Sequence, residues 1–437
     1  MKYKSFLDAL SVPEEGNENS RKSISRRRIL GASGAALCAA GCTNGPTDRD
    51  RSAEEDRSSK EEKLAQGPEG VLGANFNSEP GSVSFNELRN LSAGWVRGFL
   101  PMKGLRGADA DPAELPMVKK LLTAHRGGYG TVLSLKFPYN HRALPKPASP
   151  AMTAELARLD KVLHTVLNNI DILTIGNEPF IESLPGDRVS GALNAFYEKV
   201  TAHIIAYRKK SFRSGCRTRL YMGALNNIER PAERTKATDR WLYFTRATPE
   251  IEGVDIHPHV RSQADIQPYL DYVLPLLRKE QKFLVTEFSL VHLWKQHMKD
   301  TVPARFARRY RIPQGTPVWK IIAEAIEHPM PEERWRDFLS ISPWFENNKH
   351  FLRDQMGRFR DTGRLAVATY GVAQGASMVR DFSPRKQPWL LNSLYGNRTV
   401  ERTDDGLPVG TYGFFDDFRA LQRSEDRRPV RLKRVAT

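Results

Sequence analysis

Apolar and polar positions follow a repeating order from about residue 70 to the end of the chain. Short runs rich in apolar and β-branched residues alternate with stretches whose apolar residues recur every three or four positions, the spacing of an amphipathic helix. We expect strands at residues 71–76, 95–100, 131–137, 172–177, 220–225, 254–258, 283–288 and 365–370. The clearest helical patterns cover residues 156–166, 193–204, 266–277 and 414–421.

Strands that alternate with helices predict a parallel sheet covered by helices, the α/β class. Eight such units predict a closed (β/α)8 barrel, or TIM barrel. An open doubly wound sheet is the alternative, but no G-x-G-x-x-G follows the first strand, so its dinucleotide-binding form lacks support. The longest connection, residues 289–364, lies between strands seven and eight, and a loop of this length predicts a functional segment or a subdomain.

The amino terminus has the form of a signal peptide. A polar segment ends in Ser25-Arg26-Arg27-Arg28, and residues 29–41 are uncharged and rich in Ala and Gly. This apolar stretch is shorter than the roughly 20 residues that span a bilayer. A charged region, a short apolar region and small residues before a cleavage site are typical of export signals. We therefore assign residues 1–41 to a signal peptide.

Two details suggest the export route. Residues 25–30, Ser-Arg-Arg-Arg-Ile-Leu, resemble a twin-arginine export motif, and Ala39-Ala40-Gly41-Cys42 resembles a bacterial lipobox, whose cysteine is lipidated. Leu37 lies two positions earlier than the usual lipobox leucine, and an ordinary signal cleaved near Ala40 is the alternative. The resemblance implies an exported lipoprotein of the cell envelope or periplasm, anchored to the membrane through Cys42.

The following segment, residues 42–66, is highly charged and lacks aromatic residues, so it cannot bury enough apolar area to fold. We expect a disordered tether there, and a catalytic domain over residues 67–437. The sequence of 437 residues has only three cysteines, which excludes a disulfide framework and a zinc site built from cysteine.

The formal net charge is +16, of which residues 1–41 contribute +3. Much of the remainder follows strand seven or lies in the basic tail that includes residues 427–434. No nucleic-acid-binding motif accompanies this charge, and an exported protein rarely meets nucleic acid. The charge therefore favours an anionic glycan, or the anionic surface of the envelope, as the partner.

Two glutamates follow predicted barrel strands. Strand four ends in Gly176-Asn177-Glu178-Pro179, and strand seven ends in Thr286-Glu287. The carboxyl ends of barrel strands meet at one face, where barrel enzymes perform their chemistry. Hydrolysis of a glycosidic bond needs two carboxyl groups: one protonates the leaving oxygen, and the other attacks the anomeric carbon or activates water.

These residues resemble the clan A glycoside hydrolases, the "4/7" retaining barrels. The resemblance covers roughly residues 70–425 and implies that Glu178 is the general acid/base, Asn177 binds the sugar 2-hydroxyl and Glu287 is the nucleophile. An arginine at the end of strand two, here Arg97, accompanies the nucleophile in that clan. The implied activity is retaining hydrolysis of a β-glycosidic bond in an oligo- or polysaccharide, without a metal or organic cofactor. A barrel that only binds sugar is the alternative.

Strand six ends in Asp255-Ile256-His257-Pro258-His259, and alternation places the three ionisable residues on the interior face. Clan A members often have His-x-Tyr there, so the resemblance implies that His257 binds substrate. His259 replaces the tyrosine, and its imidazole can still donate a hydrogen bond to Glu287. Structural packing of each histidine and a His-x-His metal half-site are alternatives.

The remaining candidates are polar or aromatic residues near the predicted strand ends. Lys136, on the interior face of strand three, suits either a substrate group or an internal ion pair. Asparagines at the ends of strands one and five suit sugar hydroxyls, although turns are the favoured interpretation; they include Asn75, Asn226 and Asn227. Candidate platforms for a sugar ring, each with core packing as the alternative, include Tyr370, Trp294 and Trp389.

Overall fold

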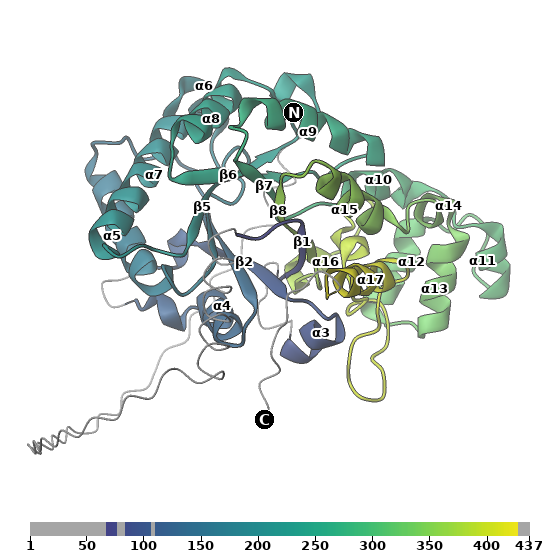
Figure 1. Ribbon diagram of the computed structural model, residues 1–437. Helices are drawn as coiled ribbons and strands as arrows, with labels where there is room; N and C mark the ends of the chain where they lie inside the picture. The colour runs from purple at the N-terminus through teal and green to yellow at the C-terminus, as the bar shows by residue number, and fades with distance from the viewer. Residues whose placement is uncertain (1–66, 77–83, 106–109, 427–437) are drawn as a thin grey trace, which may run out of the picture. The chain divides into compact units, whose positions relative to one another are not determined.

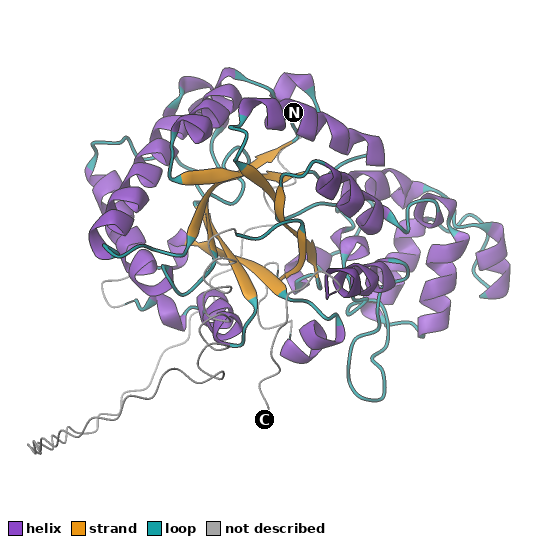
Figure 2. Cartoon of the chain, viewed as in Figure 1, coloured by secondary structure: helices purple, strands orange, loops and turns teal. Residues whose placement is uncertain are grey.

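The computed structural model describes residues 67–76, 84–105 and 110–426. Eight parallel strands form a closed barrel in chain order, and β8 pairs with β1. Figure 2 shows them as an orange ring surrounded by helices. The predicted TIM barrel is therefore confirmed. The strands are β1 (Val71–Asn75), β2 (Trp95–Pro101), β3 (Gly130–Lys136), β4 (Ile172–Ile175), β5 (Arg219–Asn226), β6 (Ile251–His257), β7 (Lys282–Val285) and β8 (Leu365–Gly371).

Helices cover the outside of the barrel (Figure 1). The α-helices are α3 (Phe85–Asn90), α4 (Pro116–Arg126), α5 (Pro150–Val166), α6 (Pro185–Ser190), α7 (Ala192–Ser211), α8 (Lys236–Ala247), α9 (Gln267–Val273), α10 (Val291–Gln296), α11 (Ala304–Arg309), α12 (Val318–Glu327), α13 (Glu332–Ile341), α14 (Pro343–Glu346), α15 (Phe351–Asp361), α16 (Ala376–Val379) and α17 (Phe414–Asp426). Short 3-10 helices are η3 (Met102–Gly104), η4 (Pro112–Glu114), η5 (Pro231–Glu233), η6 (Gln263–Ile266), η7 (Leu274–Leu276), η8 (His297–Lys299) and η9 (Trp389–Asn392).

All eight expected strands are present, but two of them end two or three residues earlier than expected. β4 stops at Ile175 and β7 at Val285, so Glu178 lies three residues beyond its strand, and Glu287, expected within strand seven, lies two residues beyond it. The helical pattern of residues 266–277 is divided into η6, α9 and η7. Pro275 lies within η7, where its ring and its missing N–H oppose a continuous α-helix.

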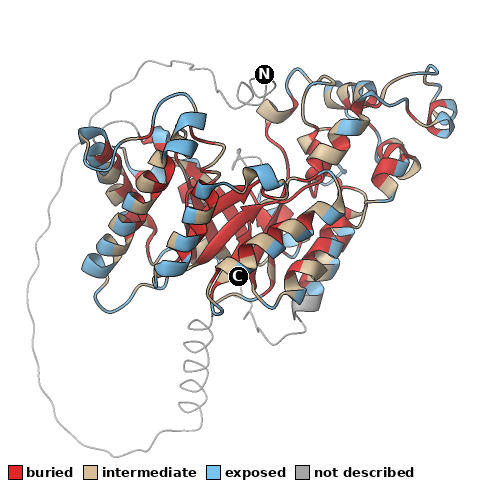
Figure 3. Cartoon of the chain, turned by 90° about the horizontal axis from the view of Figure 1, so that it is seen from above, coloured by how far each residue is buried: buried red, intermediate tan, exposed pale blue. Residues whose placement is uncertain are grey.

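Apolar side chains form two separate clusters. The large one lies between the barrel and its helices, and the small one fills the barrel with residues from five strands. Trp95 packs against the small cluster, and a Cβ built on Gly130 would lie 2.1 Å from the Trp95 ring. Glycine is therefore required beside this indole. Figure 3 shows the red, buried strands enclosed by helices whose outer faces are exposed.

The connection between β7 and β8 is a helical insertion, formed by α10 to α15 with η8. Its core is aromatic: Trp294 is fully buried and stacks on Phe345 at 5.3 Å between ring centroids, while Trp344 packs edge-on against both rings. The two strands that the insertion connects share only a short ladder. β7 and β8 pair at Phe283–Leu365 and Val285–Ala368, with a register shift between these pairs. The predicted subdomain is thus a packed helical unit.

The predicted signal peptide, the lipidation site Cys42 and the predicted tether all lie outside the described residues. Within the described ranges, no helix combines the length and the apolar composition that a bilayer span requires.

Candidate active site

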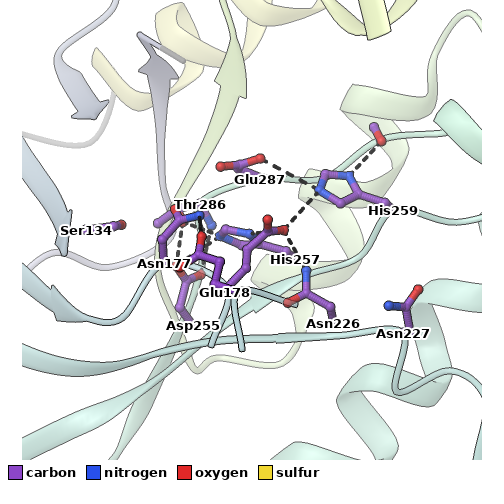
Figure 4. A network of polar contacts seen from close by, with 12 residues as sticks. Ser134, Asn177, Glu178, Asn226, Asn227, Asp255, His257, His259, Thr286 and Glu287 are labelled. Carbon is purple, nitrogen blue, oxygen red and sulfur yellow. Dashed lines mark hydrogen bonds and ion pairs between the residues drawn. The ribbon is translucent and has the colours of Figure 1, made fainter. Parts of the chain in front are cut away.

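Glu178 is positioned by a tight turn at the end of β4. Gly176 has φ of +100°, and a Cβ there would lie 2.7 Å from Pro179 and 2.9 Å from Tyr197, so only glycine fits. After this residue the chain turns, and the carbonyl of Glu178 accepts hydrogen bonds from the backbone N–H groups of Ile181 and Glu182. The turn directs the Glu178 carboxylate into the mouth of the barrel (Figure 4).

Glu287 is paired with the arginine that the sequence places on β2. Arg97 Nη1 donates to Glu287 Oε1 at 2.5 Å, and the arginine side chain is fully buried. The other guanidinium contacts are with uncharged groups: Ser134 Oγ, Asn75 Oδ1 and Asn177 Oδ1. Asn75, expected to bind sugar or form a turn, instead lies beside Arg97 and is nearly buried. A buried cation thereby fixes the position of one oxygen of Glu287.

The two glutamates face each other. One carboxylate oxygen from each lies within 4.8 Å of the other, together with one ring nitrogen each of His257 and His259. The Glu178 and Glu287 side chains remain 16% and 19% exposed, so the pair is accessible from the barrel mouth. This constellation brings together four of the predicted site residues from the ends of three strands (Figure 4).

His257 lies between two carboxylates. Its Nδ1 lies 3.2 Å from Glu178 Oε1, and its Nε2 lies 2.8 Å from Thr286 Oγ1 and 3.3 Å from Asp255 Oδ2. Burial is the largest influence on the His257 pKa and lowers it, but the charges of Asp255 and Glu287 and hydrogen bonds to Asp255 and Glu178 outweigh burial and raise the pKa to about 10. The imidazole is therefore protonated at neutral pH and donates on both sides.

Glu178 is the anionic partner of this imidazolium. Burial is the largest influence on its pKa and acts to raise it, but the hydrogen bond and charge of His257, with His259 and Lys136, hold the pKa well below its usual range. A carboxyl group that donates a proton near neutral pH by itself would need a raised pKa. The structure places the proton of this pair on His257 instead, because Asp255 behind the ring stabilises the imidazolium.

His259 lies between the two glutamates. Its Nε2 is 3.9 Å from Glu178 Oε1 and 3.7 Å from Glu287 Oε2, while Nδ1 lies 2.8 Å from Ser289 Oγ. Burial lowers the His259 pKa, so this ring is neutral beside the charged His257. Trp389 packs edge-on against the imidazole at 4.9 Å. Trp389 is thus the predicted platform that lies at the site, and it is half-buried.

Lys136 forms the internal ion pair that was one of its two expected roles. Its Nζ lies 3.1 Å from Glu182 Oε1, and the same oxygen accepts a hydrogen bond of 2.8 Å from Asn177 Nδ2. Burial acts to lower the Lys136 pKa, but the charges of Glu182 and Glu178 raise it by more than burial lowers it. The net shift of the pKa is therefore upward. Asn177 is held from both sides, by Arg97 and by Glu182.

The prediction that Trp294 and Tyr370 form platforms for a sugar ring is wrong, because both rings are buried in aromatic cores. Trp294 is fully buried within the insertion, and its Nε1 donates to Asn392 Oδ1 at 2.9 Å. Tyr370 points from β8 toward the helices, where it packs against Phe288 and Phe414. Neither ring reaches the mouth, because each completes an aromatic core that forms only when distant helices pack.

Several site residues were missed or underrated from the sequence. Asn226 Nδ2 donates to Glu178 Oε1 at 2.7 Å, although the turn interpretation was favoured for this residue. The turn is formed by its neighbour Asn227, whose φ is +57°. The signal for Asn226 was its position as the last residue of β5, which places its side chain beside the end of β4. Glu182 and Ser289 lacked such a signal, because their positions depend on loops.

No protein-family model matches the chain, and no curated protein does. Among solved structures, a glucosidase from Croceicoccus marinus is similar at 11% identity and a TM-score of 0.48, over 82% of this chain and 69% of that one. A thermostable mutant xylanase from Cellvibrio japonicus is similar at 12% identity and 0.48, over 82% and 99%. A xyloglucan-specific endo-β-1,4-glucanase from a metagenomic library is similar at 11% identity and 0.45, over 83% and 99%. Similarity at these identities and TM-scores supports no functional argument. Function is therefore inferred from the geometry of the site.

Proposed function

We propose that the protein is a glycoside hydrolase that cleaves a β-glycosidic bond with retention of configuration. The observation that carries this proposal is the carboxylate pair: oxygens of Glu178 and Glu287 lie within 4.8 Å of each other, and an ion pair with Arg97 holds Glu287 in place. Retaining enzymes have carboxyl groups about 5–5.5 Å apart, whereas inverting enzymes need about 6.5–9.5 Å to admit a water. The close spacing supports direct attack by one glutamate.

In the proposed reaction, Glu287 attacks the anomeric carbon and forms a glycosyl ester, while the leaving oxygen receives a proton from Glu178. That proton is shared with His257 Nδ1, 3.2 Å from Glu178 Oε1, so the acid is the coupled pair rather than the carboxyl group alone. Water then attacks the ester, and Glu178 accepts its proton. We expect neutral His259 to donate a hydrogen bond from its Nε2 to Glu287 Oε2 when the ester bond breaks and the carboxylate is released.

The charged residues of the site indicate whether the sugar at the point of cleavage is neutral or anionic. Arg97, His257 and Lys136 each have a carboxylate partner within the described part of the site. A sugar carboxylate or sulfate would therefore find no unmatched cation beside the glutamates. We propose a neutral sugar at the point of cleavage, with the positive charge elsewhere on the chain directed toward the envelope or other parts of an anionic glycan.

Export and anchoring remain proposals from the sequence. A twin-arginine signal and lipidated Cys42 would attach the domain to the envelope through residues 42–66. Expression in a bacterial host that exports such proteins, followed by radioactive palmitate labelling, tests this directly. Label that persists in Cys42→Ser would contradict lipidation at that residue.

Hydrolysis of a panel of aryl β-glycosides and polysaccharides is the decisive experiment. Proton NMR of the first-formed product should show the β-anomer, and appearance of the α-anomer first would exclude retention. Glu178→Gln should lose about 10²–10⁴-fold in turnover on substrates with poor leaving groups, but much less on dinitrophenyl glycosides, whose leaving group needs no proton. A sugar-binding barrel would bind glycan without product, and the ionised resting state of Glu178 is the observation that favours this second candidate.

A further inference from the structure

The catalytic candidates form a cluster whose donor atoms also suit a transition metal. Two imidazole nitrogens and two carboxylate oxygens, from Glu178, His257, His259 and Glu287, converge within 4.8 Å. A nitrogen–oxygen set of this kind suits Zn²⁺, whereas Mg²⁺ and Ca²⁺ prefer oxygen ligands alone. The pair of glutamates alone would not indicate a metal, so the argument depends on the histidines.

The distances between these donors approach those of a tetrahedral site. Zinc bonds of about 2.0–2.2 Å place neighbouring donors about 3.3–3.5 Å apart. Glu178 Oε1 lies 3.2 Å from His257 Nδ1 and 3.9 Å from His259 Nε2, and the latter lies 3.7 Å from Glu287 Oε2. The remaining donor pairs lie within 4.8 Å, so side-chain shifts of up to about an ångström would complete the geometry. Arg97 binds the other oxygen of Glu287, so Oε2 still faces the centre.

Each histidine is also anchored through the ring nitrogen that points away from the centre. Nε2 of His257 contacts Asp255 and Thr286, and Nδ1 of His259 contacts Ser289. Metal-binding histidines almost always have such a partner, which fixes the ring and, when it is a carboxylate, raises its basicity. Asp255, fully buried behind His257, completes a carboxylate–histidine arrangement that a sugar site alone does not require.

We propose that Glu178, His257, His259 and Glu287 bind Zn²⁺, and that zinc and the glycosidase substrate exclude each other. The metal takes the place of the proton between His257 and Glu178, and that proton passes to solvent. Zinc ligation occupies the nucleophile and the acid/base together, so hydrolysis stops. This inference rests on the proposed hydrolase for its effect on activity, but zinc binding can be tested without activity.

Zinc binding is measured by calorimetry on the chelator-treated full chain with Cys38, Cys42 and Cys216 replaced by serine, because thiols would bind the metal independently. One site per chain is expected. His259→Phe should weaken binding at least about 100-fold, and Ser289→Ala, which removes only the anchor of His259, about 10–100-fold. His203→Ala is the matched control, since His203 pairs with Asp160 in the helical layer and should leave zinc affinity unchanged.

The protein with the three cysteine replacements is the parent of these variants. Equal zinc affinity in the parent, His259→Phe and Ser289→Ala would overturn the proposed zinc site, as would the absence of binding at millimolar zinc. Circular dichroism establishes that each variant is folded, and Ser289→Ala decides the question if His259→Phe is not. In the parent, zinc should inhibit aryl glycoside hydrolysis with the midpoint found by calorimetry, and chelator should restore it. Bound zinc that leaves hydrolysis unchanged or increases it would overturn mutual exclusion. A protein without hydrolase activity would fail the proposed function, while the binding data still decide the zinc site.

Discussion

The barrel mouth and the insertion between β7 and β8 bury opposite kinds of side chain. At the mouth, Arg97, Asp255 and His257 are buried and held by hydrogen bonds and charge. In the insertion, Trp294 and Phe345 are buried and held by ring packing, while charged residues such as Glu324 remain on the outside. Burial of charge is costly unless it is paired. A region that accepts this cost is a candidate for chemistry, whereas an aromatic core of the same depth serves stability.

The largest effect should come from the nucleophile. We expect Glu287→Gln to reduce kcat/KM for an aryl β-glycoside on the order of 10⁴-fold or more, because it removes the carboxylate that we propose as the nucleophile. Glu324→Gln, an equal change on the surface of the insertion, should leave kcat/KM unchanged. Steady-state kinetics of both variants measures the contrast. Similar rates in the two variants would show that the mouth does not differ from the insertion in function.

The insertion should show the reverse pattern. Trp294→Ala should lower the free energy of unfolding by about 3–5 kcal/mol, because it removes a fully buried indole and leaves a cavity. Turnover per folded molecule should be retained, since the indole packs against Trp344 and Phe345 in the core of the insertion. Trp319→Ala, at a half-buried position of α12, should cost clearly less. Denaturant unfolding gives both values, and equal losses would argue against a specialised aromatic core.

The charged mouth should make stability depend on pH. The folded-state pKa of His257 is raised from 6.5 to about 10, so its contribution is fully present below about pH 6.5 and is lost as pH rises through about 10. Unfolding free energies measured in chelator should decline across this window, and His257→Gln should remove that part of the decline. Parallel curves for the parent and the variant would exclude a protonated His257.

The smallest effect is expected at Trp389. Its half-buried ring contacts His259 and is the aromatic platform closest to the carboxylates among the predicted ones. Trp389→Ala should raise KM several-fold with a smaller change in kcat, because it removes apolar area against which the apolar face of a sugar ring could be buried. Trp389→Phe should recover most of the loss. A variant in which kcat falls and KM stays constant would assign Trp389 to the positioning of His259 instead.

The sequence predicted those features that depend on one strand at a time. Period-two alternation placed Asp255 and His257 inside the barrel, and strand order brought Glu178 and Glu287 together. It also predicted that Lys136 faces inward, but its partner Glu182 depends on the turn that follows Glu178. The burial of Trp294 was beyond a local pattern, because it depends on helices more than forty residues away in the chain.

The insertion also has a consequence for how the barrel closes. β7 and β8 share a short, irregular ladder although dozens of residues separate them, so an unstructured connection would oppose their pairing entropically. Folding of the insertion around its tryptophans brings the ends of β7 and β8 close together. Pairing of these two strands, next to the proposed nucleophile, should therefore wait until the insertion has folded. Partial unfolding of the insertion should likewise separate β7 from β8 before any other strand pair separates.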